Sequence, residues 1–141
     1  MAAEPTSYAL DSFALLAYLE GEAGRSRVRE LLKGAVSGSH LVYLSLISLG
    51  EVLYITERER SLFAAHRALA AVDQLPLQIV PCPSATVLAA AHIKARYPIS
   101  YADAFAVVTA QSFHSVLLTG DPEFHSVADD NLIAVEWLPR Q

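Results

Sequence analysis

Four carboxylic acids stand out in this sequence because of the apolar residues around them. Asp11, Glu51 and Asp103 are each the only Asp, Glu, Lys or Arg within a long and mostly apolar segment, and Asp121 directly follows another apolar run. Carboxylates are rarely buried without a partner. Since the segments around the first three contain no Lys or Arg, a cation from outside the chain is the most economical partner.

These four side chains define the chemistry that the sequence could perform. Ionised carboxylates repel one another, so four of them can gather only around a strong positive charge. An all-oxygen site suits Mg²⁺ or Mn²⁺. Such an ion activates a water molecule and stabilises negative charge on a phosphodiester. The predicted reaction is therefore metal-assisted phosphodiester hydrolysis.

Each acid also has a purely structural interpretation as a helix cap, because Asp is a preferred N-cap and the S-x-x-[DE] spacing is typical of a capping box. The candidates are N-caps at Asp11 and Asp121 and capping boxes at Ser48/Glu51 and Ser100/Asp103. A carboxylate has several lone pairs, so capping and metal binding are compatible. Both interpretations stay open at this stage.

Short apolar runs alternate with helical patterns along the whole chain. The predicted strands cover residues 8–10, 40–44, 77–81, 116–118 and 133–136, with helices between them, one of which Ser84 is expected to cap. This alternation indicates an α/β fold: one domain over residues 1–141, with a mostly parallel sheet of four or five strands and helices on both faces. Right-handed crossovers would bring the four acids to one edge of the sheet.

Composition narrows the functional class. The chain has 141 residues, 53% of them hydrophobic, and a net charge of −5, which argues against coating nucleic acid through charge alone. Its apolar runs are too short for a membrane span and its amino terminus lacks a basic signal segment, so we expect a cytoplasmic protein. The single cysteine, Cys82, allows no internal disulfide.

Basic residues concentrate in two helical segments. The densest run is Arg25, Arg27, Arg29 and Lys33, and a second group is Arg58, Arg60 and Arg67. The first is either a solvated helix face or a contact to phosphates. The second is a candidate interaction surface.

The segments LDSFALLAYL, SLGEVLY, YADAFAVVTA and LLTGDPEF, in this order, resemble a PIN-domain nuclease, and among these the VapC toxins of toxin–antitoxin pairs. The resemblance spans nearly the whole chain. It implies an endoribonuclease in which Asp11, Glu51, Asp103 and Asp121 bind Mg²⁺ or Mn²⁺. Ser12 and Thr119 match small polar residues of the family motif. Glu123 stands where many relatives have Asp, which makes it an accessory residue.

The resemblance also implies partners: an RNA substrate, a small antitoxin protein and a second copy of the chain in a homodimer, with no membrane. Two alternatives share the fold: an RNA-processing nuclease without an antitoxin, and a non-catalytic binding module. A receiver-like phosphoacceptor fits poorly, because it needs a Lys late in the chain and the only lysines are Lys33 and Lys94. The five histidines show no metal-ligand spacing.

Overall fold

The computed structural model describes residues 4–140, which form a single α/β domain. Its five strands are β1 (Thr6–Leu10), β2 (His40–Ser45), β3 (Gln78–Val80), β4 (Val116–Thr119) and β5 (Val135–Trp137). They form one sheet in the order β3-β2-β1-β4-β5, and every neighbouring pair is parallel. The predicted fold class is confirmed. Residues 1–3 and 141 lie outside the described residues. They belong to the predicted domain range 1–141, and residues 1–3 also belong to the amino-terminal segment that is expected to lack a signal sequence.

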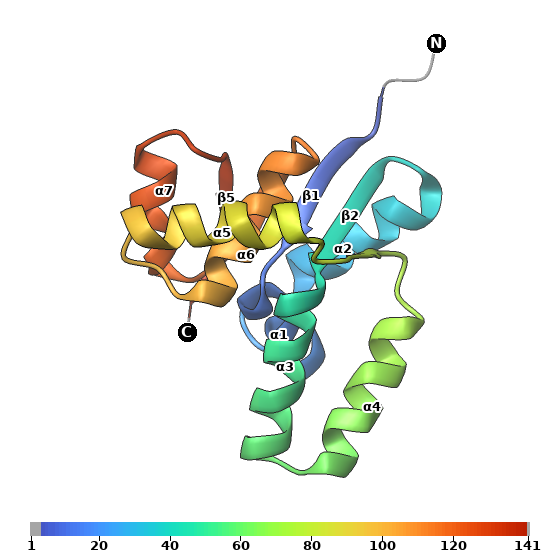
Figure 1. Ribbon diagram of the computed structural model, residues 1–141. Helices are drawn as coiled ribbons and strands as arrows, with labels where there is room; N and C mark the ends of the chain where they lie inside the picture. Colours follow the sequence, from blue (N-terminus) through green and yellow to red (C-terminus); the bar gives the residue numbers. More distant parts are fainter. Residues whose placement is uncertain (1–3, 141) are drawn as a thin grey trace.

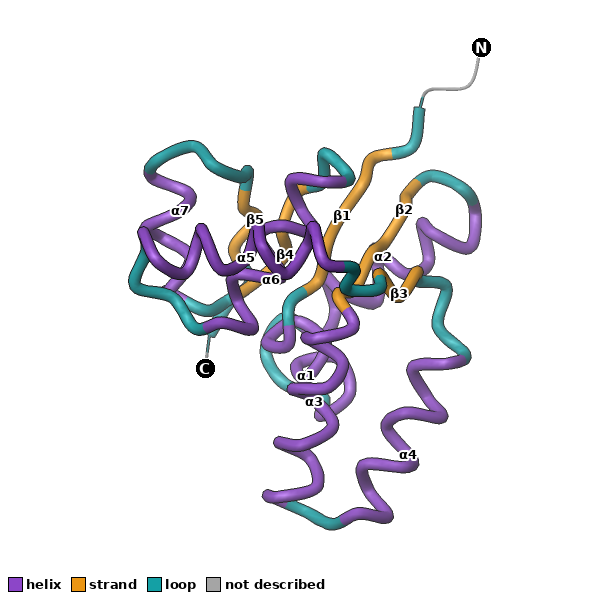
Figure 2. The backbone as a smooth tube through the Cα atoms, viewed as in Figure 1, coloured by secondary structure: helices purple, strands orange, loops and turns teal. Residues whose placement is uncertain are grey.

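Helices cover both faces of this sheet (Figures 1 and 2). They are α1 (Ser12–Glu20), α2 (Arg25–Ser37), α3 (Leu46–Glu59), α4 (Leu62–Asp73), α5 (Ser84–Arg96), α6 (Tyr101–Ser112) and α7 (His125–Asp129), with a 3₁₀ turn η1 (Pro122–Phe124). Helices α1 and α2 pack on one face, and α5, α6 and α7 pack on the other. The α3–α4 pair extends away from the sheet as a helical hairpin. Within residues 4–140, no helix is long and apolar enough to cross a membrane.

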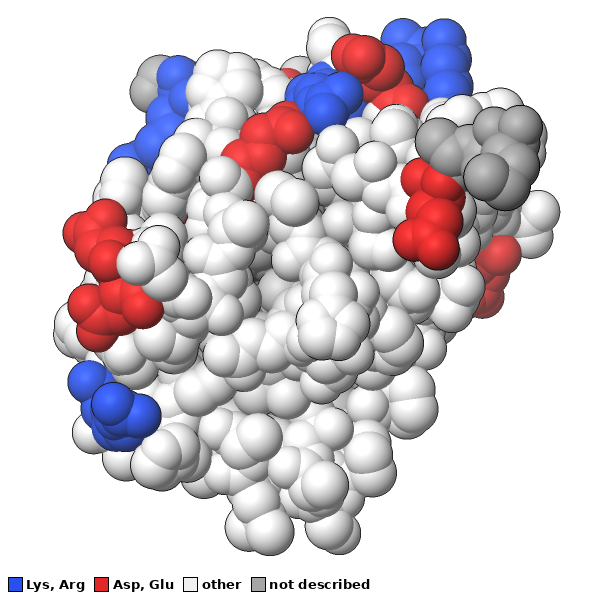
Figure 3. All heavy atoms as spheres, turned by 90° about the horizontal axis from the view of Figure 1, so that it is seen from above, with Lys and Arg blue, Asp and Glu red and all other residues white. Residues whose placement is uncertain are grey.

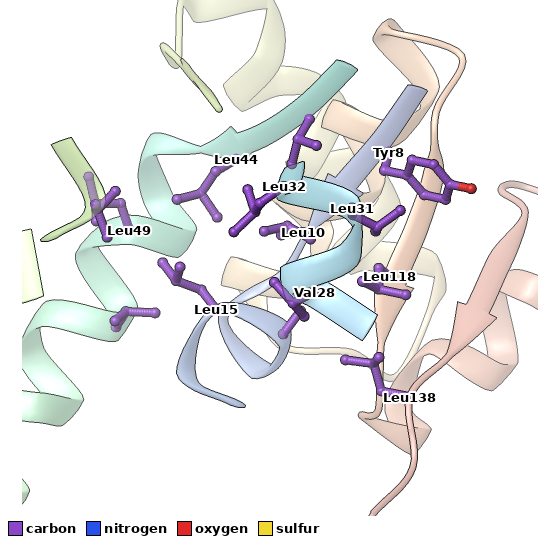
Figure 4. Close-up of a cluster of buried hydrophobic side chains, with 14 residues drawn as sticks. Tyr8, Leu10, Leu15, Val28, Leu31, Leu32, Leu44, Leu49, Leu118 and Leu138 are labelled. Carbon is purple, nitrogen blue, oxygen red and sulfur yellow. The ribbon is translucent and has the colours of Figure 1, made fainter. Parts of the chain in front are cut away.

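The central strand β1 is buried on both faces, as expected for a parallel strand between two helical layers. Tyr8 and Leu10 join the apolar cluster under α1 and α2, where Val28 and Leu31 of α2 lie against them (Figure 4). Ala9 points the other way, into the cluster with α6. Burial of this alternating pattern fixes the register of β1, because a shift by one residue would exchange its two faces.

Strand order creates a switch point beside β1. The chain runs from β1 to β2 and β3 on one side of the sheet and then to β4 and β5 on the other. Leu10 of β1 pairs with Leu118 of β4. The residues that come next, Asp11 and Thr119, therefore lie side by side at the carboxyl ends of these two strands. Open α/β sheets bind ligands at the carboxyl ends of strands at such a point.

Two local predictions are wrong. Ser84 does not cap α5: it is the first residue of that helix, and Pro83 occupies the N-cap without a side-chain hydrogen bond. The last strand begins at Val135 rather than at residue 133. The preceding turn carries Asn131 at φ 59°, and the Leu132 N–H bonds back to the Val127 carbonyl, which keeps Ile133 in the core but outside the ladder.

Candidate active site

Asp11 lies at the end of β1 and begins α1. One carboxylate oxygen, Oδ1, accepts the Ala14 N–H at 2.9 Å, which confirms the predicted N-cap, and Oδ2 accepts the Thr119 hydroxyl. Thr119 Oγ1 in turn accepts the Asp121 N–H at 3.0 Å. With Asp11 only 1% exposed and Thr119 fully buried, this network joins β1 to the turn after β4.

Asp103 lies in the first turn of α6. Ser100 Oγ caps this helix by accepting the Asp103 N–H at 3.1 Å, as predicted. The return bond of a capping box is not made by Asp103, because the Ser100 N–H donates instead to Glu123 Oε1 at 2.9 Å. Asp103, a residue with 5% exposure, therefore does not use its carboxylate as a cap.

Three acids converge at this point. Asp103, Asp121 and Glu123 each present an oxygen within 4.8 Å of the other two, and no other such group of His, Cys, Asp or Glu occurs among the residues from 4 to 140. Asp121 is also the N-cap of η1, since its Oδ1 accepts the Glu123 N–H at 2.9 Å ahead of Pro122. The cap orients η1 so that Glu123 faces α6.

Glu51 approaches from α3 and lies outside the group of three. The predicted capping box with Ser48 is wrong, because α3 begins at Leu46 behind Ser45, which leaves Ser48 buried inside the helix. Glu51 instead accepts a hydrogen bond from the Ser12 hydroxyl of α1. The predicted polar residue after Asp11 thus orients Glu51.

Two of the acids, Asp11 and Asp103, have strongly raised pKa values. Burial and the neighbouring negative charges together raise the pKa of Asp103 to about 8, with burial as the largest cause, followed by the charges of Asp11, Asp121, Glu123 and Glu51. Burial also raises the pKa of Asp11 to about 7, although the hydrogen bonds from Thr119 and Ala14 oppose the shift. The neighbouring acids therefore disfavour ionisation of Asp103, which is the behaviour expected of a carboxylate that shares a site with others.

The donor set fits a hard divalent cation. We call Asp11, Glu51, Asp103, Asp121 and Glu123 the acid cluster. The ion pairs formed within the described part of the chain involve Arg27 and Arg60, and none includes a member of the acid cluster. Oxygen donors without a basic partner suit Mg²⁺ or Mn²⁺. The Asp103 carboxylate, which makes no hydrogen bond within residues 4–140, retains its lone pairs for such an ion.

Gly120 has a different role from the one its place in the turn suggests. The φ of Gly120 is not positive, so its backbone conformation alone does not require glycine. A Cβ at this position would lie 2.3 Å from Cε1 and 2.5 Å from Cζ of Phe13. The backbone between Thr119 and Asp121 can approach α1 only because this residue has no side chain.

Gly120→Ala is therefore expected to destabilise the protein by about 1–3 kcal/mol, the usual cost of forcing atoms into a packed region. Urea unfolding measures this loss. In a Phe13→Leu background the cost of Gly120→Ala should shrink, since the clashing ring atoms are gone. An equal cost in both backgrounds would show that Phe13 is not the cause.

Glu123, which the sequence predicts only as an accessory residue, belongs to the group of three acids. Its position two residues after Asp121 gave a weak signal, but its bond to Ser100 joins residues far apart in the sequence. Within the basic run on α2, Arg27 has a structural role: it pairs with Glu136 of β5 at 2.7 Å, on the face of the sheet opposite α6. No local sequence pattern predicts the Glu123–Ser100 or the Arg27–Glu136 contact.

Comparison with known proteins places this geometry in a family. The family model described as PIN domain matches residues 8–130. A comparison with curated proteins finds no match.

Several solved structures share the fold. VapBC2 from Rickettsia felis, bound to a DNA fragment from the promoter, has 15% identity and a TM-score of 0.73, covering 95% of this chain and 100% of that one. Mycobacterium tuberculosis VapC20, described as a Sarcin-Ricin loop cleaving toxin, has 18% identity and a TM-score of 0.72, with 94% and 99% covered. DNA-bound VapBC from Salmonella typhimurium has 21% identity and a TM-score of 0.67, with 93% and 97% covered.

The family model covers most of the chain, and the solved structures share its fold over nearly their full length. The chain belongs to the PIN domain family.

Proposed function

We propose that this chain is a Mg²⁺- or Mn²⁺-dependent endoribonuclease, the cytoplasmic toxin of a VapBC-type pair, which forms a homodimer and binds a small antitoxin. One observation carries the proposal: Asp103, Asp121 and Glu123 bring their oxygens within 4.8 Å of one another beside buried Asp11, and none of these acids forms an ion pair with a basic side chain of residues 4–140. Membership in the PIN domain family and the described cleavage activity of VapC20 support it.

In this proposal Asp11, Glu51, Asp103 and Asp121 hold the ion. When bound, the ion supplies Lewis acidity that activates water and neutralises charge developing on the phosphodiester. The chain supplies orientation. Thr119 holds Asp11, whose other oxygen is fixed by the first turn of α1.

The remaining polar residues position this set. Ser12 fixes Glu51, and Glu123 ties η1 to the start of α6 at Ser100, which sets the spacing between Asp121 and Asp103. These contacts hold the carboxylates in place before any ligand arrives. A site arranged in advance needs little reorganisation when charge develops in the transition state.

The test of the proposal is cleavage of total RNA by the purified protein, mapped with Mn²⁺ or Mg²⁺ and again in excess EDTA. We expect defined cleavage sites with either ion and none in EDTA, with activity restored by adding the ion back. Equal cleavage in EDTA would overturn the metal mechanism. RNA binding that is unaffected by EDTA, without any cleavage, would favour a non-catalytic binding module.

A second surface supports the antitoxin part of the proposal. A groove of about 600 Å³ lies between the end of α1 and the α3–α4 hairpin, lined by Leu19, Glu20, Thr56, Arg60, Ser61, Phe63, Ala64, Arg67, Ala68 and Ala71. Phe63 is 71% exposed, and the Arg67 guanidinium lies over its ring. An apolar segment with flanking acidic residues would complement this groove. VapBC complexes among the structures with the same fold support a protein occupant.

Phe63→Ala is expected to weaken binding of the small protein encoded beside this chain's gene by about tenfold or more, the effect of truncating an aromatic anchor. Titration with that purified protein measures the affinity. The matched control is Val36→Ala, which shortens a 77% exposed side chain on α2. Equal affinity for both variants would show that this groove is not the docking site. Absence of an adjacent small reading frame would refute the antitoxin and leave the nuclease proposal standing.

A further inference from the structure

An exposed aromatic pair lies beside the acid cluster and has no part in the proposed metal site. The rings of His125 and Trp137 are stacked with centroids 4.1 Å apart and an interplanar angle of 22°. His125 is exposed and Trp137 is 39% exposed. Burial of a large indole normally stabilises a fold. The exposure of the Trp137 indole, already stacked on His125, therefore suggests a role in binding.

Strand register places this pair at the same edge of the sheet as the acids. Trp137 is the last residue of β5 and pairs with Thr119, the last residue of β4. Neighbouring strands are about 4.8 Å apart, and paired residues of parallel strands point to the same face. Trp137 therefore lies one strand away from the hydroxyl that bonds to Asp11 and accepts the Asp121 N–H.

The second ring comes from the same turn as two of the acids. His125 is the first residue of α7, directly after η1, which Asp121 caps and which contains Glu123. Stacking on His125 restricts the indole before any ligand binds. An aromatic surface held in advance costs little ordering entropy when a flat partner is added.

We propose that His125 and Trp137 form a stacking platform for one unpaired base of the RNA next to the scissile phosphate. This inference rests on the proposed nuclease function and adds a requirement for single-stranded substrate at the cleavage site. Base stacking on an aromatic ring is tolerant of sequence and contributes about 1–3 kcal/mol per base. Stacking also supplies affinity that does not depend on positive charge. Such affinity is useful at this edge of the sheet, because the acid cluster repels RNA phosphates.

The surrounding chemistry favours a base over a protein side chain. The platform adjoins the groups that would act on a phosphodiester, whereas the groove with Phe63 and Arg67 lies on the α3–α4 hairpin. Sequence-specific proteins bind RNA largely through unpaired bases stacked on aromatic residues. A nucleotide whose phosphate reaches the acids would bring its neighbouring base to this platform.

Trp137 is the only tryptophan in the chain, so its fluorescence reports on the platform directly. The experiment titrates the full-length Asp103→Asn protein with a single-stranded RNA decamer of mixed sequence and with an abasic decamer of equal charge. We expect the RNA to quench the emission and the abasic strand to leave it nearly unchanged. In separate titrations with fluorescein-labelled decamer, Trp137→Ala should weaken RNA binding about 5- to 150-fold, while Trp137→Phe should retain most of the affinity.

A second stacked pair provides the control. Phe113, 37% exposed, stacks on Tyr43 with centroids 4.1 Å apart, but it follows α6 at the opposite, amino-terminal edge of the sheet. Phe113→Ala should leave RNA affinity unchanged. Equal quenching by the abasic strand, no quenching by RNA, or unchanged RNA affinity of Trp137→Ala would each overturn the platform. If Trp137→Ala weakened binding only to the small protein encoded beside this chain's gene, the indole would belong to a protein interface, and the platform proposal would be overturned too.

The two proposals can fail separately. Metal-dependent RNA cleavage by the wild type without quenching refutes only the platform. Quenching by RNA but not by the abasic strand, without metal-dependent cleavage, refutes only the nuclease.

Discussion

Asp103→Asn is expected to abolish metal-dependent RNA cleavage while leaving the fold intact. The loss should be about a hundredfold or more, as when a single group that stabilises transition-state charge is removed. The Asp103 carboxylate makes no hydrogen bond within residues 4–140, and its backbone N–H is held by Ser100 in either variant. An amide at this position removes a charge and no structural contact.

Asp103→Asn should lower activity but should not lower the stability of the metal-free protein. Asp103 is a buried acid surrounded by four others, and its ionisation is unfavourable in the metal-free protein. Asp103→Asn is therefore expected to melt at the same temperature as the wild type in EDTA at pH 8, or higher. The matched control is Asp73→Asn at the exposed end of α4, which should alter neither property. Loss of activity together with a collapsed melting temperature would mean that Asp103 is structural.

The second large effect is an unusual dependence of stability on pH in the absence of metal. The ordinary pKa of Asp is 3.8, whereas that of Asp11 is about 7 and that of Asp103 about 8 in the folded protein. Between about pH 4 and pH 8 the folded state keeps protons that the unfolded chain has released. The free energy of unfolding therefore falls as pH rises, by up to about 1.4 kcal/mol per pH unit for each carboxyl. Below pH 4 the effect is absent, and above pH 8 it is complete.

A divalent cation should oppose this trend, because it binds the ionised carboxylates and only in the folded state. Stabilisation at a hundredfold excess over the dissociation constant is about 2.7 kcal/mol. Melting curves in EDTA and in Mg²⁺ at pH 5 and pH 8 measure both effects, and Asp103→Asn should reduce the pH dependence in EDTA to the part that Asp11 contributes. A melting temperature in EDTA that rises from pH 5 to pH 8, or an equal effect of Mg²⁺ at both values, would contradict the account.

Much of this fold is encoded in local patterns. Strand and helix alternation is visible in the sequence because buried parallel strands are short apolar runs separated by helical periodicity. Caps are also local: Asp11, Ser100 and Asp121 accept N–H groups two or three residues ahead, within reach of a sequence motif. Where a motif fails, as at Ser48 and Ser84, the helix starts at a different residue and the same spacing loses its meaning.

Contacts between distant segments could not be predicted in the same way. Glu123 bonds to Ser100, Ser12 to Glu51, and Thr119 to Asp11, each across elements that only the tertiary fold brings together. Gly120 shows the same limit, since its role depends on the ring of Phe13 over a hundred residues earlier in the chain. The sequence supplies the acids and their strand ends, whereas packing decides which oxygens meet.

The surface at the amino-terminal ends of the strands carries its charged side chains mainly near its margin (Figure 3). From above, looking onto the amino-terminal ends of the strands, Lys, Arg, Asp and Glu lie mainly around the margin with a broad uncharged area between them (Figure 3). The acid cluster lies at the opposite edge, where β1 and β4 end. The order of the strands and the positions where the helices begin bring these negative charges together; the overall composition of the chain does not.

The most direct test of the central claim is anomalous diffraction from crystals of the active protein grown with Mn²⁺. The account expects a manganese peak in contact with the carboxylates of Asp103 and Asp121, absent from crystals of Asp103→Asn. Saturating Mn²⁺ that supports RNA cleavage but gives no peak at these carboxylates, or a peak only elsewhere on the protein, would contradict it.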